Sequence, residues 1–129
     1  MATAAKIENS DDAHVWRMRC ELAAAFRLAA LFGWDDHVAT HMSCRLPDGS
    51  FLMNPFGLMF EEITASSLMR MDLDGNVLEI PDGLMLNPAG YGVHSSVLIA
   101  RPDMNSAMHF HTRDGVAVSA LKEGLLPLS

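Results

Sequence analysis

Apolar residues recur along the chain at spacings that change from helical to extended and back. The first 32 residues include a helical stripe, and Gly33 directly after it is a natural stop for a helix. Two hairpins are expected next, with turns at Pro47-Asp48-Gly49 and Asp74-Gly75. The pattern predicts helices at about 11–32, 91–100 and 114–121, and strands at about 40–46, 50–54, 68–72, 77–80 and 105–112.

The order of these elements is helix, strands, helix, strand, helix, which is typical of an α/β fold with much antiparallel pairing. The 129 residues leave room for one domain, which we expect at 11–129 after a disordered lead at 1–10. No apolar run approaches the ~20 residues that span a bilayer, and the first residues lack a signal-peptide pattern. We therefore expect a cytoplasmic protein.

Charge and cysteine content narrow the classes of partner. The formal net charge of −7 argues against binding to nucleic acid and against binding to an anionic membrane surface. The two cysteines, Cys20 and Cys44, have no motif spacing, so we expect both to be reduced and buried.

His109 and His111 carry the clearest candidate chemistry. Residues 105–112 alternate like a strand, in which residues i and i+2 project from the same face. Two imidazoles roughly 7 Å apart on one face can both reach one divalent ion, although a complete site needs a further ligand. Met108 and Phe110 are then expected in the apolar layer on the other face. The alternative interpretation is a pair of structural histidines that donate to backbone carbonyls at a strand end.

A series of short motifs follows in order from residue 40 to residue 112. They are Thr40-His41-Met42-Ser43-Cys44-Arg45, Asn54-Pro55-Phe56-Gly57-Leu58, Glu62-Ile63-Thr64-Ala65-Ser66-Ser67-Leu68, Asp72-Leu73-Asp74-Gly75, Asn87-Pro88-Ala89-Gly90, His94-Ser95-Ser96, Ala100-Arg101-Pro102-Asp103 and His109-Phe110-His111-Thr112. Their ordered combination resembles the class II aldolase/adducin family from about residue 15 to the last residue. The Asn-Pro-Ala-Gly motif and the tail from Ala120 to Pro127 are most similar to the adducin-like branch, in the N-terminal part of the family domain.

The resemblance implies a three-layer α/β/α fold around a mostly antiparallel sheet, truncated in this chain at the C-terminus. Family enzymes are typically cyclic homotetramers with active sites between neighbouring subunits, and they hold a divalent metal with three histidines. Matching the motifs carries two of these ligands over to His109 and His111. Zinc is the expected metal, with manganese or iron as alternatives, and it would polarise a substrate carbonyl.

The chain departs from the family's sugar-phosphate aldolases where those enzymes handle protons and phosphate. Gly90 stands where they have a catalytic carboxylate, and a hydrogen cannot transfer a proton, so the catalytic residues are unknown. Of their phosphate-binding residues only Gly57 remains, because Phe56 fills space and Pro88 lacks an amide donor. His41 and Gly57 are therefore candidates for binding an unphosphorylated carbonyl or carboxylate compound. A structural hydrogen bond is an equal alternative for His41.

The family's third histidine ligand falls beyond the last residue, together with two strands and a covering helix. The resemblance thus implies a fragment, or a chain that completes its core by oligomerising, with apolar side chains such as Leu125, Leu126 and Leu128 exposed. His94 is the nearest substitute ligand, although a core histidine or one that orients a ligand is favoured. The segment Asp35-Asp36-His37 is expected to be a polar surface loop, with metal binding as its alternative.

Two classes of function remain. The first is a metal-binding domain with lyase or decarboxylase activity on a small carbonyl or carboxylate compound; an oxygenase-type iron site would use the same ligands. The alternative is a non-catalytic, adducin-like head domain, an oligomerisation or interaction module of the cytoskeletal type, since fold does not fix function. Gly90 favours the module, and the retained His109 and His111 favour the metal site. A homo-oligomer is expected in both cases.

Overall fold

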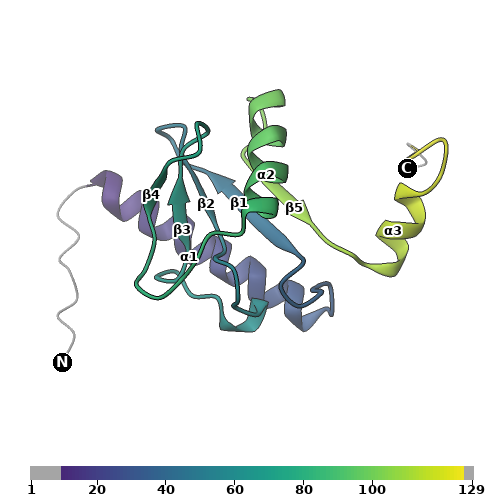
Figure 1. Cartoon of the computed structure of the whole chain (residues 1–129), viewed down its shortest axis with the longest axis horizontal. Coiled ribbons are helices and arrows are strands. Elements are labelled where there is room, and N and C mark those ends of the chain that lie inside the picture. The colour runs from purple at the N-terminus through teal and green to yellow at the C-terminus, as the bar shows by residue number, and fades with distance from the viewer. Residues whose placement is uncertain (1–9, 127–129) are drawn as a thin grey trace.

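The structure, a computed structural model, describes residues 10–126. The expected lead at 1–10 lies outside the described residues except for Ser10, with which the first helix already begins. The elements are α1 (Ser10–Leu31), β1 (His41–Arg45), β2 (Phe51–Met53), the 3-10 helix η1 (Phe60–Glu62), β3 (Met69–Met71), β4 (Val77–Glu79), α2 (Pro88–Ala100), β5 (Ser106–His109) and α3 (Arg113–Ser119) (Figure 1). Every helix and strand that the apolar spacing predicts is present, with different bounds, and η1 is additional.

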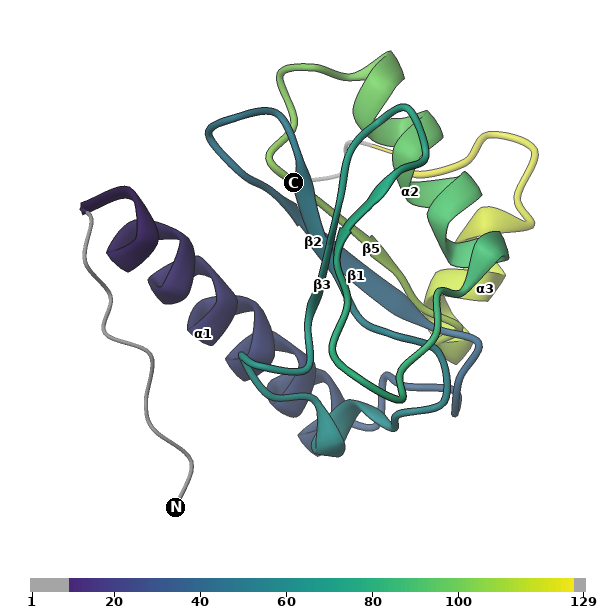
Figure 2. The same cartoon turned by 60° about the vertical axis from the view of Figure 1, so that its left-hand side comes forward.

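The five strands form one antiparallel sheet in the order β4-β3-β2-β1-β5. α1 covers one face of this sheet and α2 covers the other, which confirms the expected three-layer arrangement (Figure 2). β5 follows α2 in the chain but pairs with β1, so that His41 lies opposite His109 and Ser43 opposite Ala107. This register brings the last strand of the sequence beside the first.

Alternation along the strands divides the core into two clusters. On the α1 side, Met42 and Leu52 pack with the aromatic ring of Phe26. On the α2 side, Phe51 and Met53 pack with Leu98. Because residues i and i+2 of a strand share a face, His41 and Ser43 belong to the α2 side. The sheet thus places polar side chains of β1 directly under α2.

The ends of both long helices follow from particular residues. α1 is rich in alanine and stops at Gly33, whose φ of 66° is in the left-handed region that favours glycine. Two of the last carbonyls of α1 accept hydrogen bonds from the residues that follow: the Gly33 amide donates to the Ala30 carbonyl (2.9 Å), and the Trp34 amide donates to the Ala29 carbonyl (2.9 Å). α2 begins three residues earlier than predicted, because Asn87 accepts a hydrogen bond from the Gly90 amide (3.1 Å) and Pro88 occupies the first turn.

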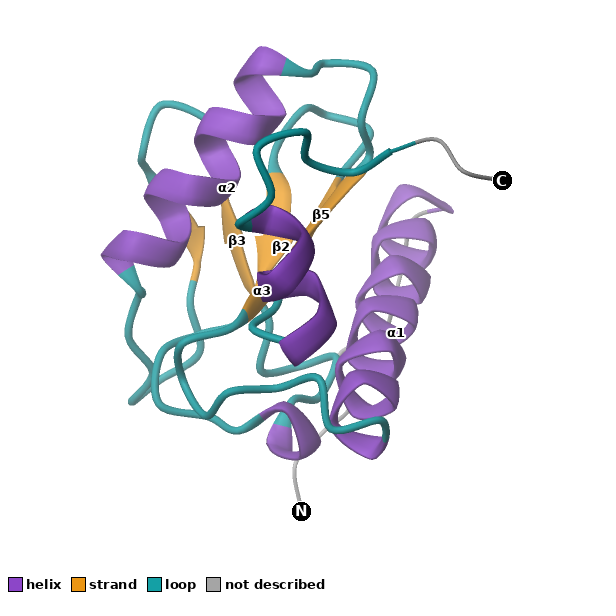
Figure 3. Cartoon of the chain, turned by 90° about the vertical axis from the view of Figure 1, so that its right-hand side faces the viewer, coloured by secondary structure: helices purple, strands orange, loops and turns teal. Residues whose placement is uncertain are grey.

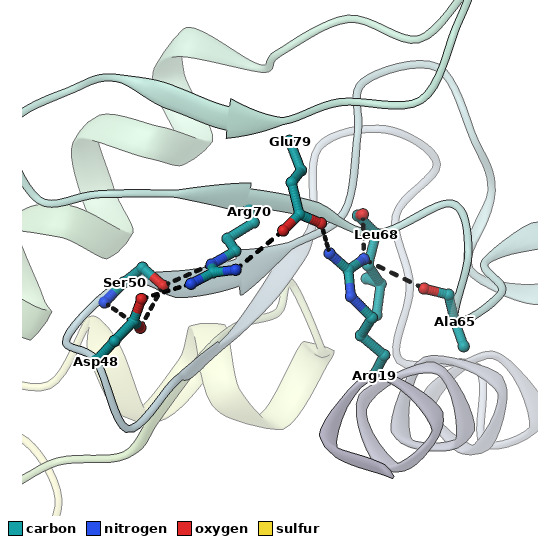
Figure 4. A network of polar contacts seen from close by, with 7 residues as sticks. All are labelled: Arg19, Asp48, Ser50, Ala65, Leu68, Arg70 and Glu79. Atoms are coloured by element: carbon teal, nitrogen blue, oxygen red, sulfur yellow. Dashed lines mark hydrogen bonds and ion pairs between the residues drawn. The ribbon is translucent and has the colours of Figure 1, made fainter. Parts of the chain in front are cut away.

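A charged network ties α1 to the far end of the sheet (Figure 4). The buried Arg19 of α1 donates to the carbonyls of Leu68 (2.7 Å) and Ala65 (3.4 Å) and pairs with Glu79. Glu79 also accepts from Arg70, which reaches Asp48 in the turn after β1. The network therefore lies at the opposite end of β1 from His41 and holds the β3–β4 hairpin against α1.

α3 stands apart from the three layers in Figure 1, and in the view of Figure 3 it lies in front of the sheet, between α2 and α1. None of its residues is buried, and Leu125 and Leu126 after it are exposed, as expected, while Leu128 lies outside the described residues. Both cysteines are free thiols, but neither is buried as expected: Cys20 is exposed and Cys44 is half-buried. Within residues 10–126, no helix is both long enough and apolar enough to cross a membrane.

Candidate metal and substrate site

Four histidines meet at the end of the sheet where β1 begins, and we call them the histidine cluster: His41, His94, His109 and His111. His41 opens β1 and lies opposite His109, which closes β5. Their rings stack, with centroids 4.8 Å apart and planes inclined by 16°. His94 approaches from α2, and its ring centroid is 5.0 Å from that of His41. β1, α2 and β5, together with the segment just after β5, therefore build one imidazole-lined site.

His109 and His111 turn their Nε2 atoms toward each other at 2.9 Å. Strand β5 ends at His109, so His111 is free of the strand geometry and its ring bends back rather than standing parallel to its neighbour. Two imidazoles bound to one tetrahedral zinc at 2.0–2.1 Å have nitrogens about 3.4 Å apart. The observed pair would have to open by only about half an ångström to hold such an ion.

Asp36 orients His111 from behind. Its Oδ2 lies 2.8 Å from Nδ1 of His111, a contact between residues 75 positions apart in the sequence. The amide of Asp36 donates to the hydroxyl of the buried Thr40 (3.1 Å), which fixes the loop before β1. The hydrogen bond from His111, followed by that from His37, holds the pKa of the Asp36 carboxyl below its usual range. With its proton on Nδ1, His111 presents an unprotonated Nε2 to His109.

The expected polar surface loop therefore has two different parts. His37 is exposed and makes only a long contact of 3.5 Å with its neighbour Asp36, whereas Asp36 reaches into the histidine cluster. The alternative in which His109 and His111 bond to backbone carbonyls does not describe these rings, since their hydrogen bonds run to each other and to Asp36. Phe110 packs on the α1 side as expected, but Met108 is 60% exposed at the edge strand.

His41 and His94 are linked in a buried chain of hydrogen bonds. Nδ1 of His41 lies 3.0 Å from Nε2 of His94, and Nδ1 of His94 lies 2.6 Å from the hydroxyl of Ser43. Burial first, and then the neighbouring histidines, lowers the pKa of both His41 and His94 to about 4. Burial and the nearby His111 also lower the pKa of His109. These rings are therefore neutral near pH 7, the state in which an imidazole can bind a metal.

Gly90 and His41 share one small space. A Cβ atom added to Gly90 would lie 3.0 Å from Cδ2 of His41 and 2.7 Å from Cε of Met53. A carboxylate side chain would be crowded there by the Met53 methyl group and by the His41 ring, and these neighbours would have to shift. In the sequence, the absent carboxylate and the additional histidine look like two separate departures. In the structure they are linked, because the histidine ring lies beside the glycine.

Gly57 lies in the exposed loop after β2 with a φ of 94°. In the described part of the chain, no hydrogen bond or ring contact connects Gly57 to the histidine cluster. Sequence reasoning missed Ser43, whose pattern signal is only its position two residues after His41 on the same face. It also missed the pairing of Asp36 with His111, for which a local pattern has no signal.

Two imidazole nitrogens that already face each other fit the ligand preferences of a divalent zinc, manganese or iron ion. Between residues 10 and 126, no group of three His, Cys, Asp or Glu side chains is arranged to hold a metal. The histidine pair would therefore supply two of the ligands around such an ion. A hollow of about 560 Å³ is lined by Trp34, Phe110, Thr112, Arg113 and Asp114, and its lining includes none of the four histidines.

Comparison with known proteins agrees with this architecture. The model of the Class II Aldolase and Adducin N-terminal domain matches residues 20–129. The chain is 53% identical over 116 residues to the "Putative aldolase class 2 protein" of Caulobacter vibrioides, covering 88% of this chain and 45% of that protein. It is 46% identical over 115 residues to alpha-adducin of Mus musculus, covering 87% of this chain and 16% of that protein.

Among solved structures, an aldolase II superfamily protein from Pseudomonas syringae aligns with a TM-score of 0.80 and 55% identity, covering 88% of this chain and 46% of that chain. The chain thus spans about half the length, or less, of the proteins that it matches. The match over most of its residues places it in a known group: the chain belongs to the class II aldolase and adducin family.

Proposed function

We propose that this chain is the metal-binding part of a lyase or decarboxylase that acts on an unphosphorylated carbonyl or carboxylate compound. The observation that carries the proposal is the convergence of the His109 and His111 Nε2 atoms at 2.9 Å, with Asp36 bonded to the far side of His111. An imidazole pair with a carboxylate behind it is the common arrangement around protein-bound zinc.

His109 and His111 would hold the metal, with zinc as the first choice and manganese or iron as alternatives. A bound divalent ion supplies a Lewis acid that polarises a carbonyl oxygen. The chain's own residues prepare the ligands: Asp36 keeps the His111 proton on Nδ1, and burial keeps His109 neutral. For binding, the neutral His109 ring would carry its proton on Nδ1 rather than on Nε2, and because protons compete with the ion for the ring nitrogens, affinity should fall at acidic pH.

The substrate class follows from what surrounds these ligands. His41, with a pKa of about 4, is neutral near pH 7 and offers no positive charge for a phosphate. Gly90 leaves no side chain for proton transfer, and a Cβ there would meet the His41 ring. We propose that His41, together with the Gly57 loop, contacts an unphosphorylated substrate. We also propose a homo-oligomeric assembly in the cytoplasm.

A second candidate function is a non-catalytic oligomerisation or interaction module. It is favoured by the filled space at Gly90, which removes the position for an acid or base, and by the sequence similarity to alpha-adducin. The two candidates differ in turnover. The enzyme should consume one of a panel of unphosphorylated 2-oxo acids and hydroxycarbonyl compounds once zinc is bound, whereas the module should consume none.

Calorimetric titration of the metal-free chain with zinc tests the metal proposal. We expect one zinc per chain, a loss of at least tenfold in affinity in His109→Ala, and a loss of about 10–100-fold in Asp36→Ala. His14→Ala is the matched control, because it removes an exposed histidine that lies outside the cluster. Absence of zinc binding, or equal affinity in the wild type and in folded His109→Ala, would overturn the proposal.

A further inference from the structure

The buried hydrogen bonds that link Ser43, His94 and His41 run in one direction. That direction follows from the Ser43 hydroxyl at the end of the series. Ser43 is 1% exposed, and within residues 10–126 its hydroxyl has a single hydrogen-bond partner, Nδ1 of His94 at 2.6 Å. A hydroxyl carries one proton, and a buried O–H without an acceptor is costly. Ser43 must therefore donate to His94 rather than accept from it.

This donation fixes both imidazoles in turn. A neutral His94 that accepts at Nδ1 carries its proton on Nε2, and it donates that proton to Nδ1 of His41 over 3.0 Å. A neutral His41 that accepts at Nδ1 must then carry its own proton on Nε2. The series of hydrogen bonds thus leaves His41 with one free group, an Nε2–H donor.

The free Nε2 of His41 opens toward the site. It has no partner in the part of the chain that the structure describes. Among the described residues, one side-chain nitrogen or oxygen atom is both fully buried and without a hydrogen-bond partner, and it belongs to Asn54. The unpartnered Nε2 of His41 is therefore not fully buried and keeps contact with solvent. The His41 ring is stacked on His109, which places this donor beside the proposed metal ligands.

We propose that Ser43 and His94 are positioning residues that hold His41 as its Nε2–H tautomer, so that the cluster offers a hydrogen-bond donor to a carbonyl or carboxylate oxygen. The use of this donor on a substrate rests on the proposed function, but the tautomer itself does not. His41 then replaces the absent carboxylate with a group of opposite role, a donor instead of a base. Gly90 contributes to the same arrangement, since a Cβ atom there would lie only 3.0 Å from the His41 ring.

Long-range ¹H–¹⁵N NMR of the metal-free chain with labelled histidine tests this proposal, because it distinguishes a protonated ring nitrogen from an unprotonated one. In the wild type we expect His41 and His94 each to show a protonated Nε2 and an unprotonated Nδ1. A protonated Nδ1 on His41 would overturn the proposal without any variant.

Two substitutions test the direction of the hydrogen bonds from Ser43 through His94 to His41. Ser43→Ala removes the donor, so we expect the His41 signals to move toward a mixture of tautomers. Ser96→Ala is the matched control, because Ser96 is an exposed hydroxyl of the same helix as His94 that bonds only to the Gly92 carbonyl. His94→Gln should keep the His41 tautomer, since an amide can accept from Ser43 and donate to His41.

An unchanged His41 tautomer in folded Ser43→Ala would show that the hydroxyl does not set the direction. The result is separable from the metal proposal. A chain that fails to bind zinc but shows the expected tautomers contradicts the proposed function alone, and a zinc-binding chain with a protonated Nδ1 on His41 contradicts only this inference.

Discussion

At the scale of single residues, the contact between Gly90 and His41 shapes the site. Gly90 and His41 are 49 positions apart by their residue numbers, yet the ring of one lies where the side chain of the other would start. Each departure is visible in the sequence. Their connection is not visible, because it depends on how α2 is set against β1.

Gly90→Ala should therefore destabilise the chain by about 1–3 kcal/mol, because the new Cβ would lie 2.7 Å from the Met53 methyl group and 3.0 Å from the His41 ring, which His94 holds in place. Gly92→Ala is the matched control in the same helix, since nothing lies within 4 Å of its added Cβ. That variant should be neutral or up to about 1 kcal/mol more stable, because alanine favours a helix over glycine. Urea unfolding measures both, and equal effects in the two variants would count against the crowding of His41.

His94 predicts how stability depends on pH. Its pKa is lowered from 6.5 in the free side chain to about 4, first by burial and then by the neighbouring His41 and His109. Between these values the unfolded chain binds a proton that the folded chain does not, so stability rises with pH across this window and is lost as the pH falls from 6.5 toward 4. The lowered pKa of His41 acts in the same direction.

Urea unfolding between pH 4.5 and 7.5 should show this slope in the wild type. His94→Gln removes one of the histidines whose pKa is lowered, so the slope should fall by about 1.4 kcal/mol per pH unit. His14→Gln, an exposed histidine on α1, should keep the wild-type slope. A slope that His94→Gln leaves unchanged would mean that burial of this ring does not set the acid sensitivity.

At the scale of elements, local signals predict which segments are helices and strands but misplace two ends that matter for the site. The alternation of 105–112 predicts a strand through His111, but β5 ends at His109. Thr112 instead accepts from the Gly115 amide (3.2 Å) and begins α3. The cap competes with the strand, and its effect is to free His111 to turn toward His109 and Asp36.

The start of α2 is the other misplaced end. Two glycines in its first turns weaken the helical pattern, while the signal at Asn87 followed by proline marks the true start. Asn87→Ala should cost about 1 kcal/mol in urea unfolding, because the Gly90 amide loses its acceptor. Asn87→Asp keeps an acceptor and should cost much less. If alanine and aspartate behave alike, the cap does not hold the helix that carries His94.

At the scale of the whole molecule, the three layers and the mostly antiparallel pairing follow from the family resemblance and from alternation, whereas the strand order and the site depend on contacts between remote segments. His109 and His111 are recognisable from their spacing. The link from Asp36 to His111 spans 75 positions, and it exists only because β5 pairs with β1 and so lies beside the loop before it. Local pattern contains no information on such a contact.

X-ray absorption at the zinc edge of the zinc-loaded chain tests the central claim most directly, because it reads the ligands of the ion itself. The account predicts scattering from two imidazole rings in the wild type and from one or none in His109→Ala. Zinc surrounded by oxygen ligands alone, or the same imidazole signal in wild type and folded His109→Ala, would contradict a metal site at the histidine pair.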